Sequence, residues 1–200
     1  MTTGARSRGS YAKTEARRVE ILRTALEAFS VSGFHGSSLR EIAEAAGLSQ
    51  AGVLHHFSSK EALLAAVLAE RDAVSVSHFE GASGVGVLDA LRGAFSENRA
   101  QPGLIRLFTT LSAEAINEAH PAHQYFQVRY DGARALVAGQ LAQGQADGEV
   151  DPDVDVDMAA ALLLAMMDGL QMQWLLNEDF DMLAAFDVFL ETFRARICTS

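Results

Sequence analysis

Residues 38–60, SLREIAEAAGLSQAGVLHHFSSK, are the stretch that most constrains the fold. Ser38 is a favourable helix N-cap, and Glu41 three residues later completes a capping-box pattern. Gly47 marks the end of a first short helix, because glycine enters the left-handed C-cap conformation at little cost. Ser49 is a second N-cap and opens a second short helix over residues 50–57. Two short helices joined by a tight glycine turn predict a helix-turn-helix unit.

The charge distribution agrees with a nucleic-acid partner for this unit, whose second helix normally enters the major groove of DNA. The 200-residue chain has a net charge of −10. Residues 1–60, however, carry eight Lys and Arg against five Glu, a net +3, which leaves −13 for residues 61–200. A basic head on an acidic body predicts that the head meets phosphates and the body faces away from them. A chance asymmetry in a soluble protein is the alternative interpretation.

Composition predicts an all-α fold. Hydrophobic residues make up 49% of the chain, charged residues 21%, and Pro occurs only three times. No strand-like alternation is sustained. The single Cys198 excludes an intramolecular disulfide framework and a cysteine zinc site, and it fits a reducing cytoplasm. Asp168 interrupts the longest apolar run, so we expect no membrane-spanning helix and a cytoplasmic protein.

Hydrophobic periodicity divides the chain into three parts. We expect a flexible basic arm over residues 1–13, a helix-turn-helix domain over 14–60, and a helical domain over 61–200. The first helix should begin near residue 14 and end at Gly33, and another should run from Lys60 to about residue 79 before the linker at 81–86. Pro102 and Pro121 fit the first turns of later helices. The remaining predicted helices cover residues 87–99, 104–119, 121–147, 154–176 and 182–197.

The stretch ALEAFSVSGFHGSSLREIAEAAGLSQAGVLHHFSSKEALL resembles the TetR (tetracycline repressor) family of bacterial regulators. The segments HPAHQYFQVRYDGARALVAGQLAQGQADGEV and DGLQMQWLLNED are similar to the BetI-like branch of that family. The resemblance implies an N-terminal DNA-binding domain and a larger C-terminal domain. The latter would hold a small-molecule pocket and form a homodimer through its last two helices.

The resemblance also assigns contacts to double-stranded DNA. Gln50 has the chemistry for a bidentate adenine contact, and Ala51 for contact with a thymine methyl group. His55 stands where the family usually has a phosphate-binding Tyr, and Leu54 stands where another Tyr is common. His56 matches the His of the family motif, and the alternative is that it is a structural hydrogen-bonding residue. The full expected set is Ser38, Arg40, Ser49, Gln50, Ala51, Gly52, His55, His56 and Lys60.

Aromatic, methionine and polar residues on the body helices suggest a ligand pocket, with plain core packing as the alternative. The expected ligand-binding set is Phe108, Phe126, Tyr130, Met167, Gln171 and Trp174. Apolar stripes on the last two helices suggest the dimer interface. The expected dimerisation set is Leu163, Met166, Leu170, Leu183, Phe186, Phe189, Leu190 and Phe193.

Other chemistry is weakly supported. His120 and His123 have metal-ligand spacing, but Pro121 lies between them, and a partly exposed helix N-terminus is the better interpretation. Alternating Asp residues at 151–157 resemble the start of a calcium loop but lack its Gly and final Glu. No catalytic set stands out, so we expect neither an enzyme, nor a cofactor, nor a bound metal.

The combined prediction is a ligand-responsive transcriptional regulator, a repressor released from a palindromic operator by a small molecule. The alternatives are a helical enzyme and a protein-interaction module that does not bind DNA. A turnover screen tests the first alternative, and a salt-dependent DNA-binding assay tests the second.

Overall fold

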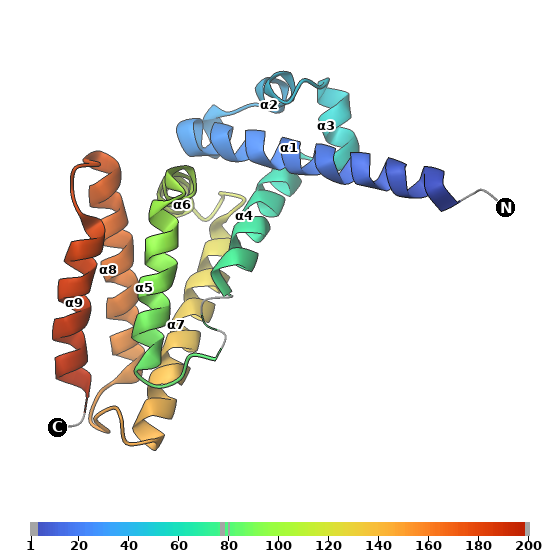
Figure 1. Ribbon diagram of the computed structural model, residues 1–200. Helices are drawn as coiled ribbons and strands as arrows, with labels where there is room; N and C mark the ends of the chain where they lie inside the picture. Colours follow the sequence, from blue (N-terminus) through green and yellow to red (C-terminus); the bar gives the residue numbers. More distant parts are fainter. Residues whose placement is uncertain (1–3, 77–78, 80, 199–200) are drawn as a thin grey trace.

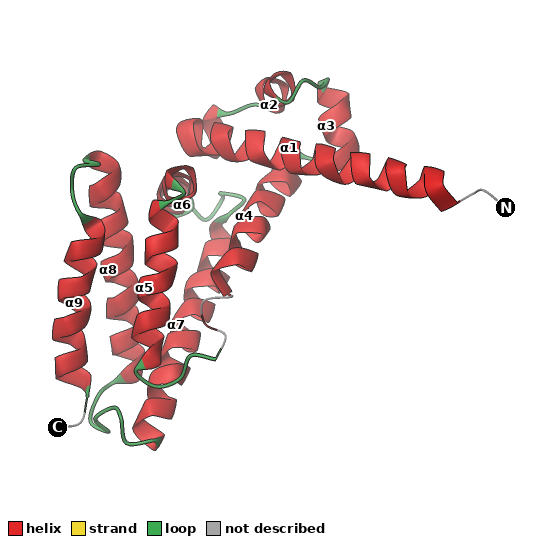
Figure 2. Cartoon of the chain, viewed as in Figure 1, coloured by secondary structure: helices red, strands yellow, loops and turns green. Residues whose placement is uncertain are grey.

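The computed structural model describes the backbone of residues 4–76, 79 and 81–198, and the side chains of residues 14–69, 79 and 81–198. The helices within these residues are α1 (Gly4–Gly36), α2 (Leu39–Ala45), α3 (Gln50–His56), α4 (Lys60–Val76), α5 (Gly86–Arg99), α6 (Pro102–Glu114), α7 (His123–Ala146), α8 (Val156–Leu176) and α9 (Met182–Ile197). The β pairing in this part of the chain is limited to one bridge between Val150 and Cys198. The predicted all-α fold is confirmed (Figure 2).

The helices form a head and a body that meet along α1 (Figure 1). In the head, α2 and α3 lie on one side of α1, and α4 descends from the head towards the body. In the body, α5, α7, α8 and α9 stand side by side, and α6 crosses beneath α1. The α1–α6 contact is therefore the main junction between the two parts.

Most predicted helices are present, with shifts at their ends. The helix predicted from residue 14 begins at Gly4 in the structure, so α1 extends past α2 and α3. Pro102 opens α6 as predicted. Pro121 does not open a helix; it lies in a turn, and α6 ends at Glu114 rather than near residue 119. The turn is stabilised locally, because the Ala122 N–H donates to Nδ1 of His120 at 3.1 Å.

Two hydrophobic clusters form the interior. The upper cluster joins the head to α4, α6 and the start of α7; its fully buried members include Ile21, Phe29, Ile42, Val53, Leu63, Leu107 and Leu111. The lower cluster lies among α5, α7, α8 and α9, with Phe95 and Phe186 in contact at a centroid distance of 4.5 Å. The packing is thus continuous across residue 60, and α4 and α6 share the core of the head.

Four of the residues expected at a dimer interface lie inside this single chain. Leu163 and Phe186 are fully buried, and Leu170 and Leu190 are less than 9% exposed, all in the lower cluster. Helices α8 and α9 use the stripes that carry these four residues to pack on each other and on the body of the same chain. Met166, Leu183, Phe189 and Phe193 are half-buried at the edge of the same cluster.

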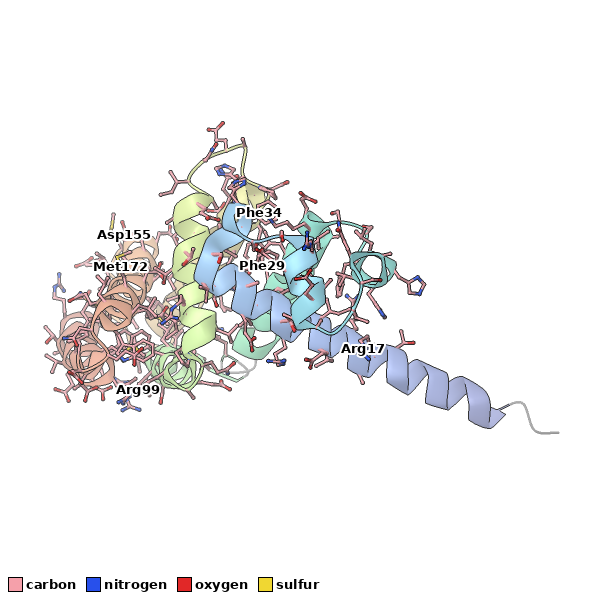
Figure 3. All side chains as sticks on the ribbon, turned by 90° about the horizontal axis from the view of Figure 1, so that it is seen from above. Arg17, Phe29, Phe34, Arg99, Asp155 and Met172 are labelled. Carbon is pink, nitrogen blue, oxygen red and sulfur yellow. The ribbon has the colours of Figure 1, made fainter. Side chains whose placement is uncertain are left out.

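A different stripe of α8 is apolar and exposed. Four large apolar side chains of α8 are each at least 51% exposed: Met158, Leu162, Met172 and Leu176. The spacings between them are sums of three- and four-residue steps, so they lie on one face of the helix. Met172 lies on the outer side of α8 (Figure 3). This helix is also long and apolar enough to span a membrane by length and composition, contrary to the expectation from Asp168. Its packing within the lower cluster identifies it as a core helix with one uncovered face.

Gly33 ends the main part of α1, as predicted, with φ 68° and ψ −177°. That conformation is essentially restricted to glycine. The carboxylate of Glu114, at the end of α6, lies directly over this position, so a Cβ at residue 33 would overlap it. The Glu114 carboxylate accepts the N–H of Phe34 at 2.9 Å. The backbone conformation therefore requires glycine, and the missing Cβ also leaves room for the Glu114 carboxylate.

Gly33→Ala should destabilise the fold. We expect a loss of at least about 1–3 kcal/mol from the strained backbone alone, with the overlap at Glu114 adding to it. Gly132→Ala is the matched control, because Gly132 lies inside α7 with nothing near its Cβ position; it should gain about 0.5–1 kcal/mol. Urea unfolding of both variants measures the difference, and equal midpoints would contradict this account.

Candidate functional site

The helix-turn-helix unit has the predicted caps. Ser38 accepts the N–H of Glu41 at 3.2 Å, and the Glu41 carboxylate accepts the N–H of Ser38 at 2.9 Å, which completes the capping box. Gly47 adopts φ 66°, and the following N–H, from Leu48, donates to Ala43 at 2.8 Å. Ser49 accepts the N–H of Gly52 at 3.1 Å and opens α3. The local sequence signals therefore determine both ends of α2 and the start of α3.

Helix α1 holds the two short helices through two arginines. The Arg17 guanidinium lies 3.5 Å from the carbonyl of Ala46, and that of Arg18 lies 3.5 Å from the carbonyl of His56. Both contacts place a cation at a helix C-terminus, where the helix dipole favours it. Arg18 also lies 4.3 Å from the ring centroid of Phe57. These roles were not predicted, because two adjacent arginines in a sequence do not show which carbonyl groups they contact.

One face of α3 is open to solvent. Gln50, Ala51 and His55 are exposed, and Leu54 is 38% exposed. On the opposite face Val53 is fully buried, and Phe57 at the C-cap is 4% exposed. Gly52 and His56 are half-buried, and the His56 ring contacts that of His55 at 5.5 Å. The structure thus brings Gln50, Ala51 and His55 together on the face that a groove would meet.

The candidate phosphate contacts differ in availability. The N–H and the hydroxyl of Ser38 both donate to the Glu41 carboxylate. The Ser49 hydroxyl oxygen accepts one N–H, and its proton remains available for donation. Arg40 pairs with Glu44 at 3.0 Å, but both side chains are more than 60% exposed. Such surface pairs contribute little and are easily exchanged for another partner. Ser49 and Arg40 are therefore better placed than Ser38 to bind a phosphate.

Lys60 is turned partly towards the interior. Its Nζ donates to the carbonyl of Ser37 at 2.6 Å and lies 4.3 Å from the ring centroid of Phe34. Burial lowers its pKa, while the acidic residues Glu61 and Glu114 oppose that shift. The ammonium has three N–H donors, so the Ser37 contact leaves others for a phosphate. Lys60 thus anchors α4 to the loop before α2, whether or not it also contacts DNA.

A cluster of polar and aromatic groups surrounds the Glu114 carboxylate. His120 is 4% exposed, and its Nε2 lies 3.3 Å from Glu114 Oε2. Its Nδ1 accepts an N–H, so the neutral ring carries its proton on Nε2, facing Glu114. The ring centroids of Phe34 and His35 lie 5.4 and 5.3 Å from that of His120. Phe34 is labelled in Figure 3. Burial lowers the pKa of His120; Glu114 opposes this shift, and His35 adds to it.

The expected partly exposed helix N-terminus is present at His123, which begins α7 and is half-buried. It is not present at His120, because the 115–122 turn folds that ring into the junction beside α1. His123 does not share a site with it; its Nδ1 lies 2.7 Å from the carbonyl of Ala115. Among the described residues, no group of three His, Cys, Asp or Glu side chains is arranged to hold a metal ion. Asp155 serves instead as the N-cap of α8, accepting the N–H of Met158 at 3.0 Å.

A cavity lies between α5, α6, α7 and α8, with a volume of about 110 Å³. Four of the six expected ligand-binding residues line it: Phe108, Tyr130, Met167 and Gln171. The other two do not: Phe126 lines a separate, more open hollow with Tyr130, and Trp174 packs in the lower cluster. Phe79, Arg129 and Asp168 also line the cavity but were missed. Asp168 and Met167 lie three and four residues before Gln171 on α8, so the sequence could have shown that the three share a helix face. The position of Phe79 beside the cavity could not be predicted in this way.

Comparison with known proteins decides the family. Residues 21–67 match the family described as "Bacterial regulatory proteins, tetR family". Residues 86–195, more than half of the chain, match "BetI-type transcriptional repressor, C-terminal". The chain belongs to the TetR family. Its head and its BetI-type body correspond to the two matched regions, which confirms the resemblance seen in the sequence.

Individual TetR-family proteins are similar over different lengths. RutR of Escherichia coli (strain K12) is 54% identical over 67 residues, which are 34% of this chain and 30% of RutR. The repressor KstR2 of Rhodococcus jostii (strain RHA1) is 32% identical over 129 residues, 62% of this chain and 53% of KstR2. The chain therefore spans about a third to a half of these curated relatives. The solved structure of Salmonella enterica GusR aligns with a TM-score of 0.73 at 28% identity, covering 90% of this chain and 96% of GusR.

The buried His120 gives the TetR-family head–body junction a pH dependence. Because the folded state lowers the pKa of His120, the unfolded chain binds a proton there more readily. The contribution of His120 is fully present above about pH 6.5 and is lost as the pH falls towards its folded pKa. His120→Gln should therefore flatten the acid side of the stability profile. Urea unfolding at a series of pH values measures this.

His55→Gln is the matched control, because His55 is exposed on α3 and away from the junction. Its pH profile of stability should follow that of the parent. If His120→Gln also follows the parent profile, the imidazole of His120 does not take up a proton on unfolding.

Proposed function

We propose that this TetR-family protein is a ligand-responsive transcriptional repressor that binds a palindromic operator as a homodimer. The exposed face of α3, held by two capped helix termini, is the single observation that carries the proposal. The match of the body to BetI-type transcriptional repressors supports the direction of control. Operator binding in a bacterial cell places the protein in the cytoplasm. We propose no enzymatic activity.

The proposed reading of DNA follows from the exposed residues of α3. Gln50 at the first turn presents an amide that matches the major-groove edge of adenine, and Ala51 a methyl group that fits a thymine methyl. Ser49, Arg40 and His55 flank these residues and bind phosphates. Such contacts set the register of the protein on the duplex without reading sequence.

The proposed homodimer forms on the uncovered stripe of α8. Its exposed members Met158, Leu162, Met172 and Leu176 would pack against the same stripe of a second copy. Val188 on α9, 65% exposed, extends the apolar surface. The two heads would then meet successive major grooves, about 34–36 Å apart.

The proposed coupling between ligand and operator runs along α6. Phe108 of α6 lines the cavity, and Glu114 at the end of the same helix holds the end of α1 through Phe34. A ligand that displaces Phe108 therefore also acts on the base of the head. Because such coupling is reciprocal, operator DNA would weaken ligand binding by the same factor.

Gln50→Ala should relax the base preference at one position of each half-site. We expect a loss of about 1–3 kcal/mol in discrimination at that base, because a bidentate contact is removed. Selection of binding sites from random DNA with the full chain measures the preference. Gln124→Ala, an exposed Gln on α7, is the matched control and should select the parental operator. Identical operator profiles for all three proteins would remove Gln50 as a reading residue.

Leu162→Glu should disrupt the homodimer, because it places a charge in the middle of the α8 stripe, where the parent residue is 53% exposed. Sedimentation equilibrium should show a shift from dimer to monomer, and operator affinity should fall with it. Val128→Glu is the matched control, since Val128 is a 65% exposed apolar residue on α7. A Leu162→Glu protein that remains dimeric would show that another surface forms the interface.

A further inference from the structure

Gln171 is the least exposed polar side chain that lines the cavity. It is 6% exposed, lies on α8 and lines the cavity between α5, α6, α7 and α8. Its side-chain amide makes no hydrogen bond to another residue in the described part of the chain. Among the described residues, the fully enclosed side-chain atom without a partner is Nε2 of His120, so the amide of Gln171 reaches the open space of the cavity, where a bound molecule can hydrogen-bond to it. The amide of Gln171 is therefore poised for a molecule in the cavity.

The two charged side chains that line the cavity have opposite signs, so their net charge is zero. Arg129 and Asp168 are the charged lining residues, one of each sign. The carboxylate of Asp168 accepts the hydroxyl of Tyr130 at 2.7 Å, and the guanidinium of Arg129 lies 4.5 Å from the ring centroid of Phe108. An ionic ligand would add a net charge to this partly enclosed space, where charge is costly to desolvate. A neutral ligand adds none.

The size and the remaining walls limit the ligand further. The cavity of about 110 Å³ is smaller than the ~150 Å³ cavity that takes benzene in an engineered protein. The enclosed space therefore takes a compact group and not a long acyl chain, and part of a ring-sized ligand lies at the open side of the cavity. Leu91, Leu164 and Met167 supply apolar walls, and Met is a side chain that adapts to the shape of a ligand.

We propose that the effector is a small neutral molecule with a carboxamide-type group on a compact apolar body, and that Gln171 recognises this group. The amide of Gln171 has both a donor and an acceptor, so a ligand amide pairs with it reciprocally. Phe79 and Phe108 enclose the apolar body of the ligand. This assignment rests on the proposed function only for the consequence of binding, the release of DNA.

Three probes of one scaffold test the charge class with the full chain: benzamide, benzoate and phenyltrimethylammonium. Isothermal titration or ligand-observed NMR measures their binding in the absence of DNA. Benzamide should bind in the millimolar range and more tightly than both ions. Tighter binding of either ion, or no saturable binding of benzamide, would overturn the proposal. Operator binding measured separately distinguishes this failure from a failure of the repressor function.

Gln171→Met tests the role of the amide, because Met keeps the length of the side chain and removes both hydrogen-bonding groups. Benzamide should bind about tenfold more weakly to this variant, whereas toluene, which has no polar group, should bind as it does to the parent. Gln173→Met, an exposed Gln on α8 outside the cavity, is the matched control and should leave both affinities unchanged. Unchanged benzamide binding by Gln171→Met would overturn the role of Gln171.

Gln171→Glu is the second variant and keeps the assignment testable if Gln171→Met also loses toluene. It keeps the shape of the side chain and adds a carboxylate to a cavity whose charges otherwise cancel. The preference should move from benzamide towards phenyltrimethylammonium. An unchanged order of the three probes would show that residue 171 does not face the ligand.

Discussion

The contact of the Glu114 carboxylate with the N–H of Phe34 is the interaction on which the arrangement of head and body depends. It forms where Gly33 breaks α1 in a backbone conformation that only glycine adopts readily. The absence of a Cβ leaves room for the Glu114 carboxylate beside the backbone of α1. One side chain thus satisfies a backbone donor of the head and lies against the buried His120 of the body.

The junction between the head and the body is packed as one continuous hydrophobic core, so a shift of one element displaces its neighbours. The upper hydrophobic cluster contains residues from the head, from α4 and α6, and from the start of α7. Lys60 adds a second tie, joining α4 to the carbonyl of Ser37 and the ring of Phe34. Close-packed interiors respond to a displaced side chain by moving whole elements rather than by local compression. The proposed ligand beside Phe108 would therefore act on a helix that supports the helix-turn-helix head.

The two proposed outer surfaces of the protein differ in chemistry for a physical reason. The α3 face that meets DNA carries small and polar side chains, because it must approach base edges and phosphates closely. The uncovered face of α8 carries large apolar side chains, which gain stability only when another surface excludes water from them. Under the proposed function each surface is completed by a partner, the α3 face by DNA and the α8 face by a second copy of the chain.

Local signals in the sequence determined the helix-turn-helix unit, because the capping box at Ser38, the glycine turn at Gly47 and the N-cap at Ser49 act within a few residues. The same motif revealed the family. The tertiary structure alone decided which apolar stripe of α8 is core and which is exposed, since both stripes have helical spacing and only packing separates Leu163 from Leu162. It also decided that His120 is buried and that Phe126 and Trp174 lie outside the cavity, because these outcomes depend on how distant helices cross.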